Sequence, residues 1–450
     1  MGDGVTTTRP FHWTLKREGT IAPDERLPWP QTIALGVQHI FAMFGATVLA
    51  PILMGFDPNT AILFSGIGTL LFFVIVGGRV PSYLGSSFSF ITVVIAASSY
   101  AGVGPNANLA VALGGIIAAG AVYAVIGLIV MRIGYAWVEF LMPPVVTGAV
   151  VMVIGLNLAH IAVGDIGALP SWAAGAKYDG FSAGMGLFTV LAVAFVTVYA
   201  PGLLRRLPIL VGGIVGYVVY LVLANGLGLS TAVIDFKALG DAAWIGMPNL
   251  TAPKFESNAV FLIAPIAIVL VAENLGHVKA VAAMTGRNLD PYLGRAFLGD
   301  GLATMIAGAG GGTGVTTYAE NIGVMAVTRI YSSLVFVIAG VVAVVMGFSP
   351  KFGALIGTIP TPVIGGLAIV LFGLIAVTGG RIWVQNKVDF SESRNLVTAG
   401  VALTLGAGDL TLNAGDFSLG GIGTATFAAI IVYQLLRIRR PSPEAAVVGS

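Results

Sequence analysis

The 450-residue sequence contains no cysteine and few charged residues. The absence of cysteine excludes disulfide bonds, thiolate catalysis and zinc–thiolate sites. Asp, Glu, Lys and Arg together make up 9% of the chain, which is too few to cover the surface of a soluble globule of this length. Apolar residues make up 57%, and the mean hydropathy is +0.95. The composition therefore predicts an integral membrane protein.

The apolar residues are gathered into segments as long as a membrane-spanning helix, which needs about 20 of them. Roughly fourteen such segments fit the chain, and its 62 glycines suit helices that pack closely or break near a site. We expect an all-α polytopic membrane protein. The predicted spans are residues 30–54, 59–78, 82–100, 108–132, 139–163, 182–200, 207–227, 258–284, 292–309, 312–328, 330–348, 361–379, 394–409 and 419–437.

Lysine and arginine are distributed unequally between the predicted loops. Positively charged loops tend to stay in the cytoplasm, so both termini are expected there. Residues 1–29 are polar and lack the pattern of a signal peptide, which predicts an N-terminal tail. The other side of the membrane receives only four of the 22 basic residues, namely Lys177, Lys237, Lys254 and Lys351.

The two halves of the chain repeat each other. The segment 144–148 (PVVTG) reappears 218 residues later as 362–366 (PVIGG). Seven spans per repeat is an odd number, so the second copy must insert upside down. Inverted repeats of this kind are typical of alternating-access transporters, whose site lies near the membrane midplane. Two further matches occur in the same order, 66–68 with 299–301 and 86–88 with 316–318.

The third and tenth spans are poor helix formers. Segments 83–90 (YLGSSFSF) and 312–318 (GTGVTTY) are rich in Gly, Ser, Thr and aromatic residues, which favour extended chain. Extended backbone at membrane depth must be buried in protein or paired, so we expect two short antiparallel β-strands. Each strand then opens into a half-helix, whose free N–H groups and positive dipole end face a central cavity.

Three ionisable residues, Glu273, His277 and Glu320, lie inside predicted spans. A charged side chain there costs about 2.5–3.5 kcal/mol on insertion scales, so such residues are functional-site candidates. Glu273 and His277 are four residues apart and share a helix face, and Glu320 begins the second half-helix. For all three residues, the structural alternative is a hydrogen bond between helices. For His39 and Asp300, the structural and the functional role have equal weight.

Two buried carboxylates beside backbone N–H donors complement a nucleobase. The edge of uracil or xanthine alternates N–H and C=O groups, which pair with carboxylates and backbone N–H groups respectively. The wrong ligand would leave buried polar groups unpaired. Carboxylates in one cavity also make proton uptake together with substrate physically reasonable, and His277 could share or relay that proton.

The motifs around these residues resemble those of nucleobase-ascorbate transporters. The resemblance extends over about residues 22–436, and segments 22–28 and 278–288 are most similar to the pyrimidine permeases of that family. It implies a secondary active transporter that imports uracil and related nucleobases, with thymine or xanthine also possible, by proton symport and elevator-type alternating access. The motifs are 271–277 (VAENLGH), 316–326 (TTYAENIGVMA), 83–88 (YLGSSF) and Gln38-His39.

The resemblance also implies how the chain is divided. It predicts fourteen spans in two inverted seven-span repeats, a homodimer in the inner membrane, and no cofactor, metal or nucleic-acid partner. The predicted core domain comprises residues 30–133 (spans 1–4) and 258–348 (spans 8–11). The predicted gate domain comprises residues 139–227 (spans 5–7) and 361–437 (spans 12–14), and residues 1–29 and 438–450 are cytoplasmic tails.

Substrate contacts follow from the resemblance position by position. Glu273 and Glu320 would hydrogen-bond the base, and His277 with Glu320 would couple transport to protons. The remaining implied contacts are Phe88 and Ala319 through their backbone N–H groups, Ala46 and Tyr318 around the ring, and Ser87, Asn321, Asp300 and His39 in support. Ala319 and Phe372 differ from the glycine and tyrosine of uracil permeases, which bears on the substrate range.

Four other functions are weighed against this prediction. A purine-preferring or xanthine-preferring permease of the same family would keep the same site. A sulfate-type anion carrier of the same fold is disfavoured, because an anion prefers donors without carboxylates. An intramembrane enzyme using Glu273 and His277 lacks a further ligand set and the His-Glu-x-x-His pattern, and a receptor without transport would not need a hidden carboxylate pair.

Overall fold

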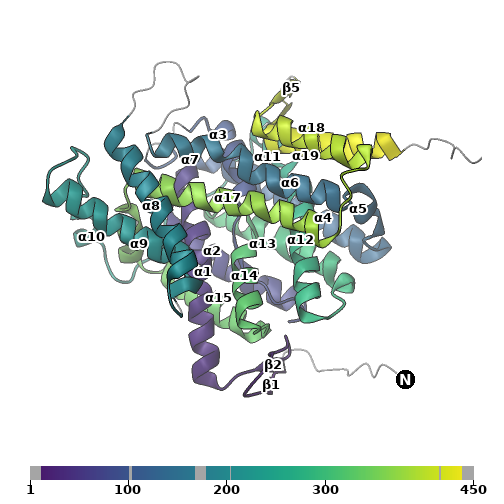
Figure 1. The fold of residues 1–450 in the computed structure, drawn as a ribbon, viewed down its shortest axis with the longest axis horizontal. Helices are drawn as coiled ribbons and strands as arrows, with labels where there is room; N and C mark the ends of the chain where they lie inside the picture. Colours follow the sequence, from purple (N-terminus) through teal and green to yellow (C-terminus); the bar gives the residue numbers. More distant parts are fainter. Residues whose placement is uncertain (1–11, 101–103, 168–178, 203, 415–416, 438–450) are drawn as a thin grey trace, which may run out of the picture.

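The computed structural model describes residues 12–100, 104–167, 179–202, 204–414 and 417–437. Residues 1–11 of the expected N-terminal tail, Lys177 and the expected C-terminal tail 438–450 lie outside the described residues. The described chain is mostly helical, as the sequence predicts (Figure 1).

Eight helical stretches of the described chain are long and apolar enough to cross a membrane, or nine if α15 (Ser333–Gly347) and α16 (Pro350–Gly357), bent by 84°, form one span. The count of fourteen spans stays a prediction. The eight stretches are α1 (Trp29–Met54), α2 (Pro58–Ile75), α4 (Leu109–Ile133), α6 (Pro144–Asn157) with α7 (Ala159–Asp165), α8 (Gly180–Tyr199), α9 (Pro208–Tyr220) with the π-helical η3 (Leu221–Gly226), α11 (Ser257–Ile263) with α12 (Ile266–Thr285), and α17 (Thr361–Gln385).

Shorter or less apolar elements complete the fold. The helices are η1 (Phe88–Phe90), α3 (Ile91–Ser98), α5 (Ala136–Leu141), η2 (Leu204–Arg206), α10 (Lys237–Asp241), η4 (Asp290–Tyr292), α13 (Leu293–Gly310), α14 (Ala319–Thr328), α18 (Ser393–Ala407) and α19 (Gly421–Arg437). The strands are β1 (Thr14–Leu15), β2 (Glu25–Arg26), β3 (Leu84–Ser86), β4 (Val315–Thr317), β5 (Leu412–Ala414) and β6 (Phe417–Leu419).

The turn between α1 and α2 shows how local sequence sets helix ends. Gly55 ends α1 with φ 72°, in the left-handed region that glycine adopts readily. Asp57 caps α2, because its Oδ1 accepts the backbone N–H of Asn59 at 3.0 Å. Pro58 takes the first helical position, where its missing N–H leaves no bond unmade. Both helix ends therefore follow from three nearby residues, Gly55, Asp57 and Pro58.

Helices from the two halves pack against each other in a reciprocal pattern. Helix α4 lies along α13, and α2 lies along α15. In the predicted numbering these are spans 4 with 9 and 2 with 11. Spans 2 and 9 are equivalent in the two predicted repeats, and so are spans 4 and 11. Glycines permit the close approach: a Cβ on Gly120 would lie 2.7 Å from the Gly301 oxygen, and one on Gly66 would lie 2.6 Å from the Gly340 oxygen.

Two short strands meet inside the helical bundle. Strand β3 pairs with β4 in antiparallel fashion, with Leu84 opposite Thr317 and Ser86 opposite Val315. All six strand residues are buried. The strands lie in the predicted third and tenth spans, and each leads into a short helix, η1 with α3 and then α14. The expected strand pair is therefore present, and both half-helices begin beside it.

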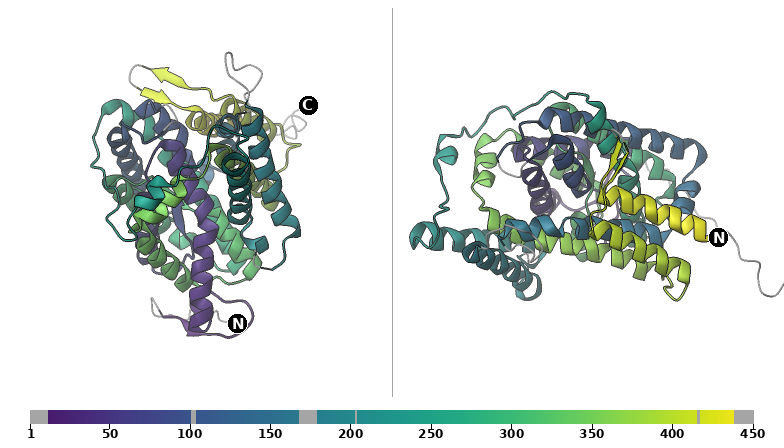
Figure 2. Two further views of the ribbon diagram at one scale, coloured as in Figure 1. Left: turned by 90° about the vertical axis from the view of Figure 1, so that its left-hand side faces the viewer. Right: turned by 90° about the horizontal axis from the view of Figure 1, so that it is seen from above.

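The N-terminal strap, residues 12–27, lies at the end of α1 remote from the β5–β6 hairpin (Figure 2). Within the strap, β1 pairs with β2 in parallel. The strap docks onto the segment between α14 and α15: the Ile21 N–H donates to the Arg329 oxygen at 3.1 Å, and its oxygen accepts from Tyr331 at 2.8 Å. Trp13 Nε1 donates to Ser333 Oγ at 3.0 Å. The strap is thus part of the packed structure.

Candidate functional site

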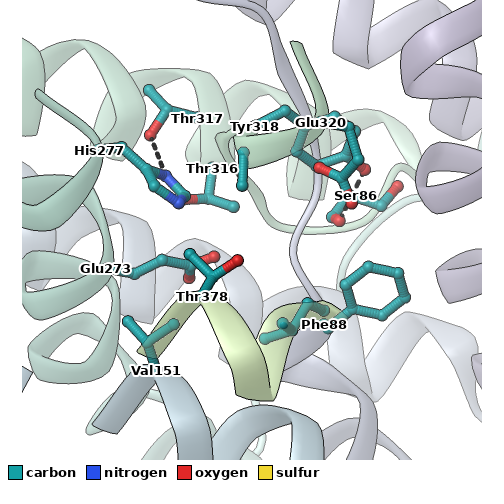
Figure 3. A pocket seen from close by; sticks show the side chains of 12 residues that line it. Ser86, Phe88, Val151, Glu273, His277, Thr316, Thr317, Tyr318, Glu320 and Thr378 are labelled. Atoms are coloured by element: carbon teal, nitrogen blue, oxygen red, sulfur yellow. Dashed lines mark hydrogen bonds between the residues drawn. The ribbon is translucent and has the colours of Figure 1, made fainter. Parts of the chain in front are cut away.

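A pocket opens beside the strand pair. The space between its lining side chains, including the part open to solvent, is about 370 Å³. Figure 3 shows side chains from several separate elements turned toward it. The pocket is lined by Ser86, Phe88, Val151, Glu273, His277, Thr316, Thr317, Tyr318, Ala319, Glu320, Ile375 and Thr378.

The two glutamates singled out in the sequence face this one pocket. Glu273 comes from α12, and Glu320 is the second residue of α14 (Figure 3). The Ser89 hydroxyl donates to Glu273 Oε2 at 3.5 Å. Glu320 stands in the first turn of its helix, where the helix dipole favours negative charge. The pocket therefore holds two carboxylates contributed by segments nearly fifty residues apart in the chain.

Both half-helices begin at this pocket, and their first residues carry backbone N–H donors. Phe88 starts η1 and Ala319 starts α14, and both residues line the cavity. The first N–H groups of a helix have no acceptor within the helix. Ser87 caps η1, since its side chain accepts from the Ser89 N–H at 3.3 Å. Carboxylate acceptors and backbone donors thus lie around one space.

A contact with a residue of strand β4 positions His277. Its Nδ1 lies 2.9 Å from the hydroxyl oxygen of Thr317, the last residue of β4 (Figure 3). The ring stands one helical turn from Glu273 on the same face of α12. The strand pair therefore positions the imidazole as well as the half-helices.

A buried polar layer supports the pocket. The Tyr318 hydroxyl donates to the Ser86 oxygen at 2.9 Å and accepts from Thr47 at 3.1 Å. Asn274 Nδ2 donates to Asp300 Oδ2 at 2.6 Å. The bonds of Tyr318 join α1 to the region of the two strands, and the bond between Asn274 and Asp300 joins α12 to α13.

The predicted supporting residues lie around this layer rather than in the lining. Asn321 Nδ2 lies 3.0 Å from both the oxygen and Nδ1 of His39. Ser87, Asp300 and Ala46 are also buried, and none of these five is among the residues that line the pocket. The roles assigned to them from the sequence stay predictions, including the contact between Ala46 and a base.

Sequence reasoning did not assign site roles to half of the lining. Three of these residues lie in the extended segments that the sequence did single out: Ser86, Thr316 and Thr317. The other three come from α6 and α17: Val151, Ile375 and Thr378. In the sequence these last three look like ordinary apolar or small residues of a membrane helix, so no local signal could have found them.

The described residues hold no group of three or more His, Cys, Asp or Glu that could bind a metal ion. What the pocket offers is a pair of carboxylate acceptors, one imidazole, hydroxyl groups and helix-starting N–H donors. Such a set can bind a small planar molecule that carries both N–H and C=O groups.

Comparisons with known proteins identify the family of the chain. A model described as "Permease family" matches residues 30–415. The chain is 61% identical to "Putative pyrimidine permease RutG" of Escherichia coli (strain K12), over 96% of this chain and 97% of that protein. It is 42% identical to "Uracil permease" of Bacillus caldolyticus, over 92% and 94% of the two chains.

Solved structures share the fold at low sequence identity. The transmembrane domain of the cyanobacterial bicarbonate transporter BicA matches with a TM-score of 0.61 and 16% identity, over 90% of this chain and 97% of that one. The murine Solute Carrier 26 family member A9 anion transporter matches with a TM-score of 0.65 and 12% identity, over 90% and 68%. Both show the fold alone. On the strength of the sequence matches, the chain belongs to the permease family, that of the nucleobase-ascorbate transporters, and it is a transporter rather than an enzyme.

Proposed function

We propose that this permease imports uracil and related nucleobases together with protons. The observation that carries the proposal is that Glu273 and Glu320 face one pocket at the start of two half-helices. The names of the relatives, uracil permease and pyrimidine permease, support the nucleobase class.

The pocket complements a base through its pattern of donors and acceptors. Glu273 and Glu320 can accept the ring N–H groups, and the N–H groups of Phe88 and Ala319 can donate to its carbonyl oxygens. A ligand lacking one of these groups leaves a buried polar atom unpaired, at a cost of about 1–3 kcal/mol. Selectivity for a neutral base follows from this cost.

Proton coupling rests on the shared location of substrate and titratable groups. Glu273, Glu320 and His277 all line the cavity that would hold the base. Binding of a proton to any of them changes the electrostatic potential at the bound base and therefore the affinity for the base. Binding of the base changes the affinity for the proton in the same sense. A base and a proton that favour each other's binding are then carried together.

An elevator-type movement suits a pocket built between two sets of helices. We propose that residues 30–133 and 258–348 form a moving core, and that residues 139–227 and 361–437 form a static gate and the dimer contact. Glu273, His277 and Glu320 would then travel with the core, while α6 and α17 supply the opposite wall. Both termini would lie in the cytoplasm, with the protein in the inner membrane.

A transporter of this fold could carry two other classes of substrate, anions and purines. The structural neighbours BicA and Solute Carrier 26 member A9 are named as bicarbonate and anion transporters, but two carboxylates at the pocket oppose an anion. A purine such as xanthine presents the same alternating N–H and C=O edge. The purine alternative is therefore an outcome of the test, while the anion is disfavoured.

The test is uptake of radiolabelled uracil by cells that lack their own uracil permeases. We expect saturable uptake that collapses when a protonophore is added. Excess unlabelled thymine or xanthine would compete according to affinity, whereas sulfate would not. Uptake of a purine but not of uracil would show a purine preference and overturn the assignment of uracil as substrate. If the protein is present in the membrane and no base is taken up, the proposal is overturned.

A further inference from the structure

The wall of the pocket contributed by α6 and α17 differs from the rest of the lining. It consists of Val151, Ile375 and Thr378. All three side chains are β-branched, and such side chains have restricted χ1 angles in a helix. They therefore form a stiff surface facing the carboxylates, the imidazole and the half-helix starts.

Helix α17 is held tightly at this level. A Cβ on Gly379 would lie 2.4 Å from the Gly148 oxygen of α6, so the two backbones nearly touch. One turn further along, Trp383 Nε1 donates to the Val145 oxygen at 3.0 Å. Both contacts lie just C-terminal to Thr378, so they hold this part of α17 against α6.

Thr378 is the one member of this wall that has a polar side chain. Its Oγ1 donates to the Leu374 oxygen of the preceding turn at 2.8 Å. A hydroxyl has one proton and two lone pairs, so after this bond it can accept a hydrogen bond but cannot donate one. Figure 3 shows the side chain turned into the cavity, on the side where Glu273 enters.

We propose that Thr378 is a specificity-determining residue of this pocket, which accepts an N–H group of the bound base from the α17 side. This inference rests on the proposed function, since it concerns the same base in the same pocket. Together with Glu273 and Glu320, Thr378 makes the site rich in acceptors. A ligand with N–H groups is favoured there, and one that turns oxygen atoms toward α17 is rejected.

Two substitutions separate the acceptor from the shape of the side chain. Thr378→Val keeps the branched shape and removes the oxygen, and Thr378→Ser keeps the oxygen and removes the methyl group. The matched control is Thr197→Val, because Thr197 Oγ1 makes the same bond to the Val193 oxygen, at 2.7 Å, on a helix outside the pocket lining. Thr378→Ala is a second variant without the acceptor, used if the Val variant does not reach the membrane.

The readout is the KM and Vmax of uracil uptake, with the amount of protein in the membrane measured in parallel. We expect Thr378→Val or Thr378→Ala to raise KM about tenfold, the loss typical of one unpaired polar group. Thr378→Ser and Thr197→Val should stay within about twofold of the wild type. A role in helix packing alone would lower the amount of protein and leave KM unchanged.

The outcomes distinguish this assignment from the function on which it rests. Normal wild-type uptake with an unchanged KM in the Val and Ala variants overturns the role of Thr378 alone. An equal rise of KM in the Ser and Val variants also overturns it, because shape rather than the acceptor would then decide. Wild-type protein that takes up no base overturns the proposed function and this assignment together.

Discussion

Asp24 and Arg287 lie 263 residues apart in the sequence and form an ion pair of 2.5 Å between Oδ1 and Nη2. The pair joins the N-terminal strap to the connection between α12 and α13. Both side chains remain partly exposed, so the pair itself contributes at most about 1 kcal/mol. The fully buried side chain of Ile21, on the same strap, contributes more.

The first prediction compares these two strap contacts. Ile21→Ala should lower the free energy of unfolding by about 2–4 kcal/mol, because it leaves a cavity under the strap. Asp24→Asn should lower it by about 1 kcal/mol or less. Thermal unfolding of the purified protein measures both, and an Asp24 variant that loses more stability than the Ile21 variant would contradict the assigned roles.

The two carboxylates of the pocket carry the second prediction. Glu273→Ala should abolish uracil uptake because a ring N–H loses its acceptor. Glu320→Gln should abolish it because an amide cannot take up a proton and presents an N–H donor in place of one acceptor oxygen. Insertion of both variants into the membrane should be unchanged. Glu256→Gln is the control, since this exposed carboxylate lies just before α11 and outside the pocket lining. Normal uptake by either pocket variant would contradict the assignment of these two glutamates to the substrate site.

The third prediction concerns the crowding behind the strands. A Cβ on Gly85 would lie 2.4 Å from Cζ of Tyr318 and 2.5 Å from Oγ1 of Thr47, so Gly85→Ala must displace the tyrosine. We expect a loss of about 1–3 kcal/mol in stability and weaker uracil uptake. Gly323→Ala, on α14, meets no atom within 4 Å and should be neutral or stabilising. Equal thermal stability of the two variants would count against the packing described.

Thr317 positions the imidazole in the fourth prediction. Thr317→Val removes the oxygen that lies 2.9 Å from His277 Nδ1. We expect uptake to fall about tenfold and its pH profile to change shape, because the orientation and proton of the ring are no longer fixed. Thr317→Ser keeps the oxygen and should restore the wild-type profile. Identical profiles in all three proteins would show that this bond has no part in coupling.

The fifth prediction is a pH effect at the connection after α12. Burial raises the pKa of Asp290, but the Lys279 ammonium at 2.6 Å and the Tyr135 hydroxyl at 2.7 Å outweigh it, so the pKa lies below its ordinary value. A lowered carboxyl pKa stabilises the folded state above the ordinary value of about 3.9, and the gain is lost as the pH falls through the folded-state pKa.

Asp290→Asn should therefore have a lower Tm than the wild type at pH 7. The difference should shrink below about pH 4, where the wild-type carboxyl becomes protonated. Thermal unfolding over a pH series measures this. A Tm difference that is constant across the series would contradict the ionic origin of the effect.

Local composition was enough to predict several features of this protein. The scarcity of charge and the apolar segments identify a membrane protein. Segments 83–90 and 312–318 favour extended chain, and the structure pairs them as β3 and β4. Glu273, His277 and Glu320 stand out because a charged group is costly among apolar neighbours. Each of these signals depends only on a residue and its near neighbours along the chain, so it can be recognised from the sequence alone.

The tertiary structure alone decided which distant segments meet. Val151, Ile375 and Thr378 line the pocket because α6 packs against α17, yet each is an unremarked residue of an apolar helix. Ala46 does not line the pocket, and its contact with a base stays a prediction. The face that a membrane helix turns toward a pocket depends on its packing with neighbouring helices, since all its faces are apolar and no amphipathic pattern marks one of them.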